Sequence, residues 1–239
     1  KLTVLIENDA ETGLASEHGL SVAVQSGGET VIFDTGQSSA LAATARVLGI
    51  DVARTKAVVI SHNHYDHAGG LDAVYSLCLP PLYVAKGIEG GFFEGFPPEA
   101  VNVIDGPTEV IPGVIASGPI PRKTIFESPR ADVPEDQALI VKAERASALL
   151  VGCAHAGAIN TLEFAAKLTG SRSFDIVLGG FHLWMSGAEL IGKTAGALDS
   201  FDIRTLALGH CTGGEALKRF DRELTAEVIG CPAGTTFEL

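Results

Sequence analysis

Short apolar runs alternate with glycine-rich turns along the first third of the chain. The runs are rich in β-branched residues, which favour strands over helices. The Gly27-Gly28 pair between two of them predicts a tight hairpin turn. A segment with helical spacing, Ser39–Leu48, follows, with Ser38 as its N-cap and Gly49 as its C-terminal stop. The predicted strands are Leu2–Glu7, Ser21–Gln25 and Thr30–Phe33.

The next apolar run, Lys56–Ile60, carries apolar residues on both faces, as a strand covered on both sides of a parallel sheet does. A short helix is expected over Gly70–Ser76. The region from about Leu79 to Pro134 holds most of the prolines and many glycines, so it predicts loops joined by short strands. Those strands are Pro81–Val84 and Val114–Ser117.

Strands and helices alternate over the last hundred residues, which predicts parallel pairing with crossover connections. We expect one domain over 1–239, with similar halves at about 1–130 and 135–239 that pack sheet on sheet with helices outside. This is an α/β fold, a four-layer αββα sandwich. The expected strands are Ala138–Ala143, Ala148–Gly152, Asp175–Leu178 and Arg204–Leu208, and the expected helices Ile159–Leu168, Ala188–Leu198 and Glu215–Leu224.

Composition narrows the class of protein. The 239 residues are 46% hydrophobic and 19% charged, which suits a folded globular chain and not a disordered one. A net charge of −12 argues against nucleic-acid and membrane partners, whose phosphates require a basic face. It permits a small phosphorylated substrate, because bound metal supplies local positive charge. The sequence has no run of 18 apolar residues.

The cysteines and the first residues of the sequence indicate the cellular location of the protein. The four cysteines show no Cys-x-x-Cys pairing, and a chain of this length does not need disulfides, so we expect reduced thiols and a cytoplasmic protein. The opening Lys1–Glu7 run is too short for a signal peptide and predicts a strand. Because the sequence starts at Lys1 and not at Met, removal of a preceding segment stays open, as does the oligomeric state.

The richest chemistry lies in the stretch Ser61-His-Asn-His-Tyr-Asp-His-Ala-Gly-Gly70, directly after an apolar run. Three imidazoles and one carboxylate within six positions suit zinc, manganese or iron. His62 and His64, two residues apart, point to the same side of an extended segment and can hold one ion. Asp66 and His67 are offset from that pair and are free to hold a second ion. A polar loop with chance histidines is the less probable interpretation.

Three further histidines each follow an apolar, β-rich run directly: His155, His182 and His210. Ligands gather at the carboxyl ends of strands in parallel sheets, so four strand ends are expected to deliver histidine to one rim. Taken singly, each of the three is as compatible with a structural histidine as with a ligand.

These motifs resemble the metallo-β-lactamase superfamily, whose signature is His-x-His-x-Asp-His at the end of a strand. Asp34, His155 and His210 fall in the order in which that superfamily supplies its remaining site residues. The resemblance implies the αββα fold and one or two divalent ions, zinc first, with manganese, iron or magnesium as alternatives. It assigns His62, His64 and His155 to the first ion, and Asp66, His67 and His210 to the second. It also implies that Asp34 orients the histidine loop from behind the ligands.

One position departs from the hydrolytic members, which place an aspartate that bridges both metals after the strand corresponding to Asp175–Leu178. The chain has Gly179-Gly180-Phe181-His182 there. This pattern is similar to a narrower group, the 7,8-dihydropterin-6-methyl-4-(β-D-ribofuranosyl)aminobenzene-5′-phosphate synthase-like proteins. The motifs of that group occur in this sequence in the same order. They are Glu17-His18-Gly-Leu-Ser, Ile120-Pro-Arg, Gly152-Cys-x-His, Gly179-Gly-x-His and Gly209-His-Cys-Thr-Gly.

Three functions remain open. The first is a metal-dependent hydrolase in which activated water attacks a small ester, phosphoester or lactone, with Asp66 in the catalytic centre. The second, implied by the narrower resemblance, is a transferase that expels pyrophosphate from a pterin substrate. His18 and His182 then act as acid–base or substrate-anchoring residues. The third is a metal-binding protein without turnover.

Other residues are weaker candidates. Arg122 or Arg130 is a candidate clamp for a substrate phosphate, although a solvated or ion-paired arginine is the more common situation. Cys211 is a less favoured metal ligand, because neighbours such as His210 and Cys211 point to opposite faces of a strand.

Overall fold

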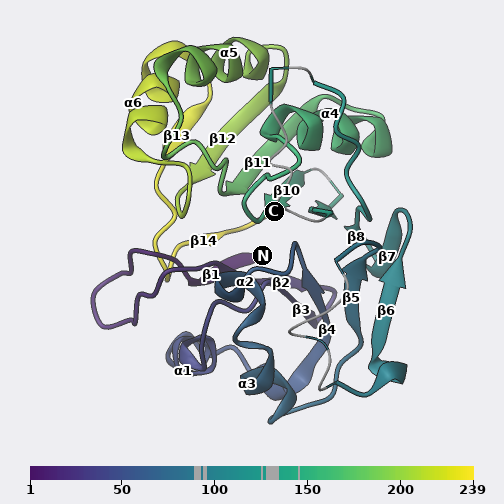
Figure 1. The fold of residues 1–239 in the computed structure, drawn as a ribbon. Coiled ribbons are helices and arrows are strands. Elements are labelled where there is room, and N and C mark those ends of the chain that lie inside the picture. The colour runs from purple at the N-terminus through teal and green to yellow at the C-terminus, as the bar shows by residue number, and fades with distance from the viewer. Residues whose placement is uncertain (89–92, 94–95, 125, 128–134, 145) are drawn as a thin grey trace.

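The computed structural model describes residues 1–239 apart from 89–92, 94–95, 125, 128–134 and 145. Within them, two mixed sheets of seven strands pack against each other, and helices cover both outer faces (Figure 1). This is the predicted four-layer αββα sandwich. The chain fills the first sheet almost completely before it enters the second.

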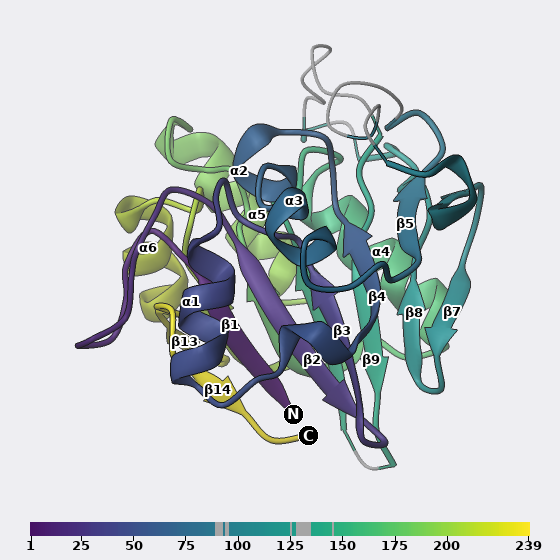
Figure 2. The ribbon, with the colours of Figure 1, turned by 90° about the horizontal axis from the view of Figure 1, so that it is seen from below.

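The first sheet has the strand order β14-β1-β2-β3-β4-β5-β6. Strand β4 pairs in parallel with both β3 and β5, as its apolar sequence predicts. Helices α1 and α3 lie across the outer face of this sheet (Figure 2). Its elements are β1 (Leu2–Ile6), β2 (Ser21–Ser26), β3 (Glu29–Phe33), α1 (Ala40–Val47), β4 (Thr55–Ile60), α2 (Tyr65–Ala68), α3 (Leu71–Tyr75), β5 (Leu82–Ala85), β6 (Val101–Ile104) and β14 (Thr236–Phe237).

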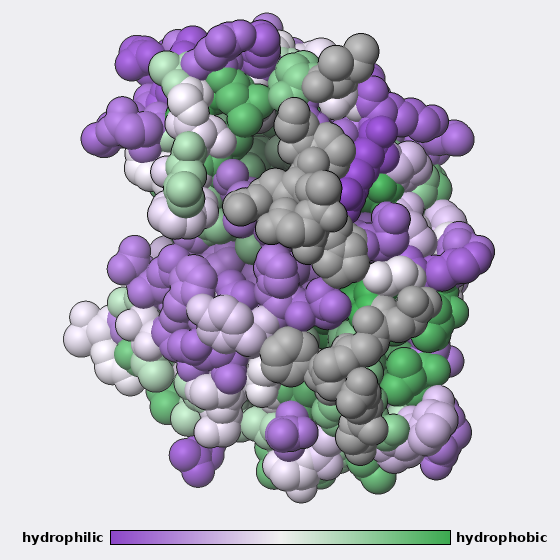
Figure 3. Space-filling model, viewed as in Figure 1, coloured by the Kyte–Doolittle hydropathy of each residue, from purple (hydrophilic) through white to green (hydrophobic). Residues whose placement is uncertain are grey.

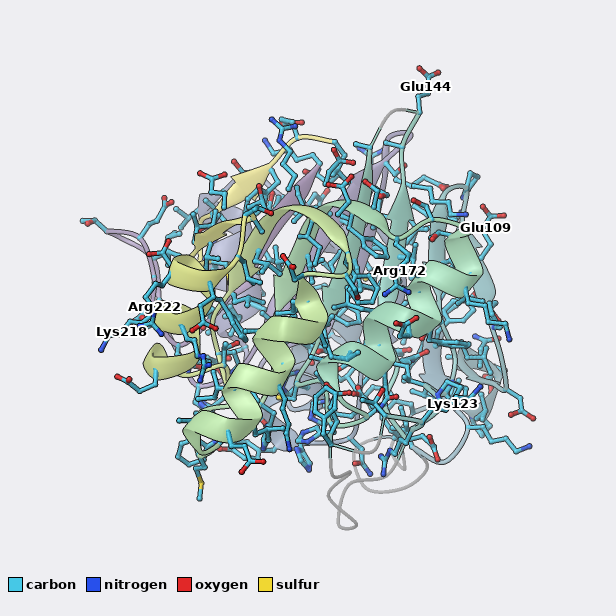
Figure 4. All side chains as sticks on the ribbon, turned by 90° about the horizontal axis from the view of Figure 1, so that it is seen from above. Glu109, Lys123, Glu144, Arg172, Lys218 and Arg222 are labelled. Carbon is cyan, nitrogen blue, oxygen red and sulfur yellow. The ribbon has the colours of Figure 1, made fainter. Side chains whose placement is uncertain are left out.

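The second sheet has the order β13-β12-β11-β10-β9-β8-β7, and β10 to β13 run parallel as expected. Three helices cover its outer face, and the charged side chains of Lys218 and Arg222 project away from it (Figure 4). Its elements are β7 (Thr108–Ile111), β8 (Val114–Ala116), β9 (Leu139–Lys142), β10 (Ser147–Val151), α4 (Ala158–Thr169), β11 (Ser173–Gly179), α5 (Ala188–Leu198), β12 (Asp202–Leu208), α6 (Gly214–Glu223) and β13 (Glu227–Ile229).

Strand β4 shows how the sequence builds these layers. Ala57 and Val59 face the second sheet, whereas Val58 and Ile60 pack under the helices of the first. Successive side chains of a strand point to opposite faces, so a strand between two apolar layers has to be apolar throughout. All four side chains are buried. The strand is therefore held on both faces up to the point where the histidine loop begins.

The predicted turn and helix signals are also present. Gly27 and Gly28 both have positive φ, as the two-residue turn between β2 and β3 requires. The predicted N-cap is displaced by one residue: α1 begins at Ala40 and its N-cap is Ser39, which makes no side-chain capping bond, whereas Ser38 accepts the Ala40 amide at 3.1 Å. Gly49 follows the helix with a φ of 74°.

Three features of the topology differ from the expectation. Strands β6, β7, β13 and β14 are short and were not predicted. The chain leaves the first sheet after Ile104 and enters the second at Thr108, earlier than the expected division near residue 130. Finally, β14 returns to the first sheet and pairs with β1. Short edge strands lack the sustained alternation that sequence analysis detects.

The two sheets are joined beside the histidine loop by the buried side chain of Gln137, just before β9. Its amide nitrogen Nε2 donates to the carbonyls of Ile60 at 2.8 Å and Tyr83 at 3.2 Å. The Gln137 backbone amide donates to the carbonyl of Ser61 at 2.9 Å. One residue just before β9 thereby connects the second sheet to the end of β4 and to β5 in the first.

Replacing this side chain is expected to weaken the whole fold. Gln137→Ala leaves two buried carbonyls without their donor, so the free energy of unfolding should fall by about 2 kcal/mol in denaturant titrations. Asn102→Ala is the matched control, because Asn102 makes two longer amide contacts, 3.3 and 3.4 Å, at a half-buried edge position. It should cost less than about 1 kcal/mol. Equal losses in both variants would contradict the link.

Among the described residues, none of the helices combines the length and apolar character that crossing a membrane demands.

Candidate metal centre

The six predicted ligands gather where the two sheets meet, at the carboxyl ends of their strands. Ring nitrogens of His62, His64 and His155 all lie within 4.8 Å of one another. The first two follow β4 in the first sheet, and His155 follows β10 in the second. The structure thus brings together the three residues predicted for the first ion.

The second predicted set is tighter. An oxygen of Asp66 lies 3.3 Å from Nε2 of His210 and 3.6 Å from Nε2 of His67. The two Nε2 atoms are 3.1 Å apart. His64 is the N-cap of the short helix α2, and its carbonyl accepts the amides of His67 and Ala68. This single helical turn places Asp66 and His67 beside the end of β12.

Asp34, predicted to orient the loop, does so through three hydrogen bonds. Its carboxylate accepts the backbone amide and the hydroxyl of Ser61, each at 2.7 Å, and Nδ1–H of His67 at 2.7 Å. All three residues are fully buried. Because Nδ1 of His67 carries the proton, its Nε2 presents a lone pair toward Asp66 and His210.

Ser61 sets the tautomer of the neighbouring histidine in the same way. Its single hydroxyl proton goes to Asp34, so its oxygen accepts Nδ1–H of His62, 2.8 Å away. Nε2 of His62 is buried and has no hydrogen-bond partner among the described residues. A buried hydrogen-bond acceptor without a partner destabilises the folded state unless a ligand binds to it.

The orientation of His210 depends on two residues that the sequence analysis missed. The backbone amide of His210 donates to the buried carboxylate of Glu7. Asn8 accepts Nδ1–H of His210 at 3.1 Å, and its own amide donates to the His210 carbonyl at 3.1 Å. Nothing in the local pattern around Glu7 and Asn8 indicates this role, because the contact spans more than 200 residues of sequence.

Four non-glycine residues in the described part of the chain have left-handed backbone conformations, and all four follow strands that end at this site. They are Asp34, Ala154, His182 and His210, with φ between 49° and 55°. The left-handed region disfavours residues with a Cβ atom, so such outliers mark sites where the surroundings impose the conformation. At His210 the left-handed turn also places Cys211 on the same side as the histidine, and these two lie together with Cys153. The expected opposite orientation of His210 and Cys211 is therefore wrong.

Three more side chains join the cluster. Nε2 of His18 lies 3.3 Å from an oxygen of Asp66, and its side chain is half exposed. His182 groups with His155 and Cys153. The buried thiol of Cys153 lies 3.2 Å from Nε2 of His67. Cys153 was not predicted as a site residue, although the Gly-Cys-x-His motif contains it.

Charges inside the cluster shift the pKa values of its members. Burial, together with the neighbouring histidines, holds the pKa of His62 well below its usual range. Burial also opposes the charged form of His67, but Asp34 outweighs it and raises the pKa of His67. Burial raises the pKa of Asp66, but the contact with His210 and the charge of His67 outweigh it and lower the pKa.

These observations fit a divalent metal centre. Imidazole nitrogens with fixed tautomers, one ionised carboxylate and a partnerless buried His62 nitrogen form a donor set that zinc and similar ions prefer. Second hydrogen bonds at His62, His67 and His210 orient the rings.

Two cavities open beside the cluster. The metal cavity, of about 450 Å³, is lined by His18, His64, Asp66, His182, His210 and the aromatic rings of Tyr65 and Trp184, among others. The apolar cavity, of about 320 Å³, is lined by His155, His182, Phe181, Met185 and Leu190, among others. His182 lines both. Figure 3 shows hydrophilic side chains gathered along the boundary between the two halves, where the surface is indented.

The predicted arginine clamp finds no support in this geometry. Arg122 is half-buried and is absent from the described lining of both cavities. Its charge acts instead on the carboxyl group of Asp136. Arg130 lies outside the described residues.

A histidine-rich metal centre between two packed sheets defines the class of protein. The chain belongs to the metallo-beta-lactamase superfamily, whose family model matches residues 17–160. It is similar over its whole length to the crystal structure of Tm1679, a metal-dependent hydrolase of the beta-lactamase superfamily, with 30% identity, 98% of that chain covered and a TM-score of 0.82.

Two relatives come from Methanocaldococcus jannaschii. The chain is 26% identical to an uncharacterised protein, with 92% of this chain and 94% of the relative covered. It is 25% identical to 7,8-dihydropterin-6-methyl-4-(beta-D-ribofuranosyl)-aminobenzene-5'-phosphate synthase, with 92% and 89% covered. The narrower resemblance found in the motifs is thus confirmed.

Asp136 lies close enough to Asp34 and His67 for their charges to act on it. Its carboxyl group is fully buried, one oxygen accepts the Ala156 amide at 3.2 Å, and the other has no hydrogen-bond partner among the described residues. Burial raises the pKa of Asp136 to about 7. The folded chain therefore keeps a proton here at pH values where the unfolded chain has lost it.

This proton makes stability depend on pH. Between about pH 4 and 7 the folded state binds more protons than the unfolded state, so the contribution of Asp136 to stability decreases as pH rises. Asp136→Asn stays neutral throughout. Its free energy of unfolding relative to wild type should improve by about 2 kcal/mol from pH 5 to pH 8. Denaturant titrations that give parallel pH curves for the two proteins would contradict this assignment.

Proposed function

We propose that the protein is a metal-dependent hydrolase that acts on a small ester, phosphoester or lactone with one or two divalent ions, zinc first. The observation that carries the proposal is the convergence of two ligand sets, from strand ends of both sheets, beside a cavity of about 450 Å³. The similarity to a metal-dependent hydrolase at 30% identity over the whole chain supports it. Convergent polar groups in a cavity are the usual form of an enzyme site.

In this proposal His62, His64 and His155 hold one ion, and Asp66, His67 and His210 hold the other. When bound, the ions would supply Lewis-acid polarisation of a substrate oxygen and lower the pKa of a coordinated water. Asp34 keeps His67 in the tautomer that presents Nε2. The rigid network behind the ligands fixes their positions before substrate arrives, which reduces reorganisation during the reaction.

His18 and His182 are the candidate proton carriers. Both line the metal cavity, and neither belongs to the two proposed ligand sets. His18 contacts Asp66 at 3.3 Å and is half exposed, so it can exchange protons with solvent. His182 stands between the metal cavity and the apolar cavity. A substrate that reaches from one cavity to the other would pass His182.

The second candidate is a synthase that expels pyrophosphate from a pterin substrate. Two observations favour it: residues 179–182 offer no bridging carboxylate, and two aromatic rings, Tyr65 at 54% exposure and Trp184 at 60%, line the metal cavity. Aromatic faces suit a planar heterocycle. The 25% identity to a synthase supports it. The substrate-sized cavity argues against a third possibility, metal binding without turnover.

Metal analysis of the ligand variants, followed by substrate screening, tests the proposal. His62→Ala and His155→Ala should mainly empty the first site, and Asp66→Ala and His210→Ala the second, with metal-to-protein ratios measured after dialysis. Wild type should hydrolyse a phosphoester, ester or lactone in a chelator-sensitive way. Unchanged ratios in all four variants would falsify the ligand assignment.

The same screen separates the two enzyme classes. A pterin pyrophosphate is included together with an aromatic carbon nucleophile, and pyrophosphate release is measured with and without that nucleophile. Release that requires the nucleophile would select the synthase over the hydrolase. Loaded protein that turns over no substrate of any of these classes would count against both.

Variants of His182 show whether this residue is a metal ligand or acts on the substrate. We expect His182→Ala to keep the metal and lose turnover by roughly 10²–10⁴-fold, the usual contribution of a positioned acid or base. His182→Asp should not restore activity, because a shorter carboxylate does not replace the imidazole at the entrance of both cavities. A joint loss of metal content and thermal stability in His182→Ala would instead make His182 a ligand.

A further inference from the structure

The centre of the cluster holds a thiol that the proposed ligand sets leave unused. Sγ of Cys153 lies within 4.8 Å of ligand atoms of His62 and His155, which belong to the first set. It also lies within 4.8 Å of ligand atoms of His67 and His210, which belong to the second. The residue is 3% exposed. Cys153 therefore stands between the two proposed ion positions.

The separation between sulfur and nitrogen fits shared coordination. Sγ of Cys153 is 3.2 Å from Nε2 of His67. A thiolate and an imidazole on one tetrahedral zinc, at about 2.3 and 2.0–2.1 Å from the ion, lie about 3.5 Å apart. Nε2 of His67 and Nε2 of His210 are likewise 3.1 Å apart. Movements of a few tenths of an ångström would bring each of these two pairs to the separation of ligands on one ion.

The space around the cluster is already filled by thiols and not by a carboxylate. A Cβ atom at Gly180 would lie 2.6 Å from Sγ of Cys211 and 2.9 Å from the carbonyl of Gly152. No side chain at position 180 can enter the cluster without displacing Cys211. Among the described residues, the carboxylates that contact ring nitrogens of the proposed ligands are Asp66, already assigned, and Asp34, whose oxygens accept three hydrogen bonds.

We infer that Cys153 supplies a thiolate ligand shared by the two ion positions, in place of a bridging carboxylate. The inference rests on the proposed metal-dependent function. A thiolate has several lone pairs and can contact two ions, and its proton leaves to solvent when the metal binds. A sulfur ligand favours zinc or cobalt over magnesium or calcium at this centre.

Cys211 is the natural comparison. Its Sγ groups with His210 and Cys153 but not with any residue of the first ligand set. It contacts the carbonyl of Cys153 at 3.9 Å, a distance that admits at most a weak sulfur hydrogen bond. Cys231 is also buried, and it packs near Gly209 behind the cluster. These two cysteines provide matched controls for a thiol-to-serine change.

The test uses Co²⁺ alone, added to metal-free protein under anaerobic conditions. Bound thiolate gives a sulfur-to-cobalt charge-transfer band in the near ultraviolet, which histidine and carboxylate do not give. We expect the band in wild type, Cys211→Ser and Cys231→Ser, and its loss in Cys153→Ser. The affinity of Cys153→Ser for Co²⁺ should also be at least roughly 10–100-fold lower than that of wild type. Loss of a hydrogen bond to a metal ligand already has an effect of this size, and loss of a ligand should not have a smaller one.

The outcomes separate this inference from the proposed function. If wild type binds Co²⁺ without the band, or if the band persists in Cys153→Ser, Cys153 is not a ligand. Neither result contradicts the proposed metal centre of histidines and Asp66. Loss of the band in Cys211→Ser alone assigns the thiolate to Cys211 and also overturns the role of Cys153. Wild type that binds no Co²⁺ overturns both proposals. Thermal unfolding of the metal-free variants confirms that each is folded.

Discussion

The site depends on the hydrogen bonds that the Asp34 carboxylate accepts at the end of β3. It holds the Ser61 amide, the Ser61 hydroxyl and Nδ1 of His67, and through Ser61 it also fixes His62. One buried group thereby decides which nitrogen of two histidines faces the cluster. Tautomers are otherwise nearly equal in energy, so a metal centre without such a group would have to select them at the moment of binding.

The junction of the two sheets is the second requirement. His155 and His210 come from the second sheet, whereas His62, His64, Asp66 and His67 come from the first, so no half of the chain contains a complete ligand set. Gln137 links the two sheets beside the histidine loop, and Glu7 and Asn8, which directly follow β1, contact the backbone and ring of His210. Folding of the two sheets onto each other and assembly of the site are the same event.

Much of this could be predicted from the sequence, for physical reasons. The strongly apolar run before His62 and the glycine pair at 27–28 act locally, so their strand and turn were found. The histidines after strands were found because parallel strand ends share an edge. Asn8 and Asp136 were missed because their roles depend on contacts across more than one hundred residues or on burial. The side chain of Cys211 lies on the side opposite to the one predicted, because the strand does not continue through His210, where the backbone is left-handed.

The left-handed backbone at Asp34, Ala154, His182 and His210 has a consequence for the evolutionary record of such a chain. Only glycine, and to a lesser extent asparagine, aspartate and histidine, occupy that region readily. The four positions would stay restricted in descendants that had lost the metal but kept the strand ends. Alanine at position 154 shows the restriction without any ligand chemistry of its own. Invariance at these positions would therefore report the geometry of the rim, and the identity of the chemistry has to be sought in the side chains that surround it.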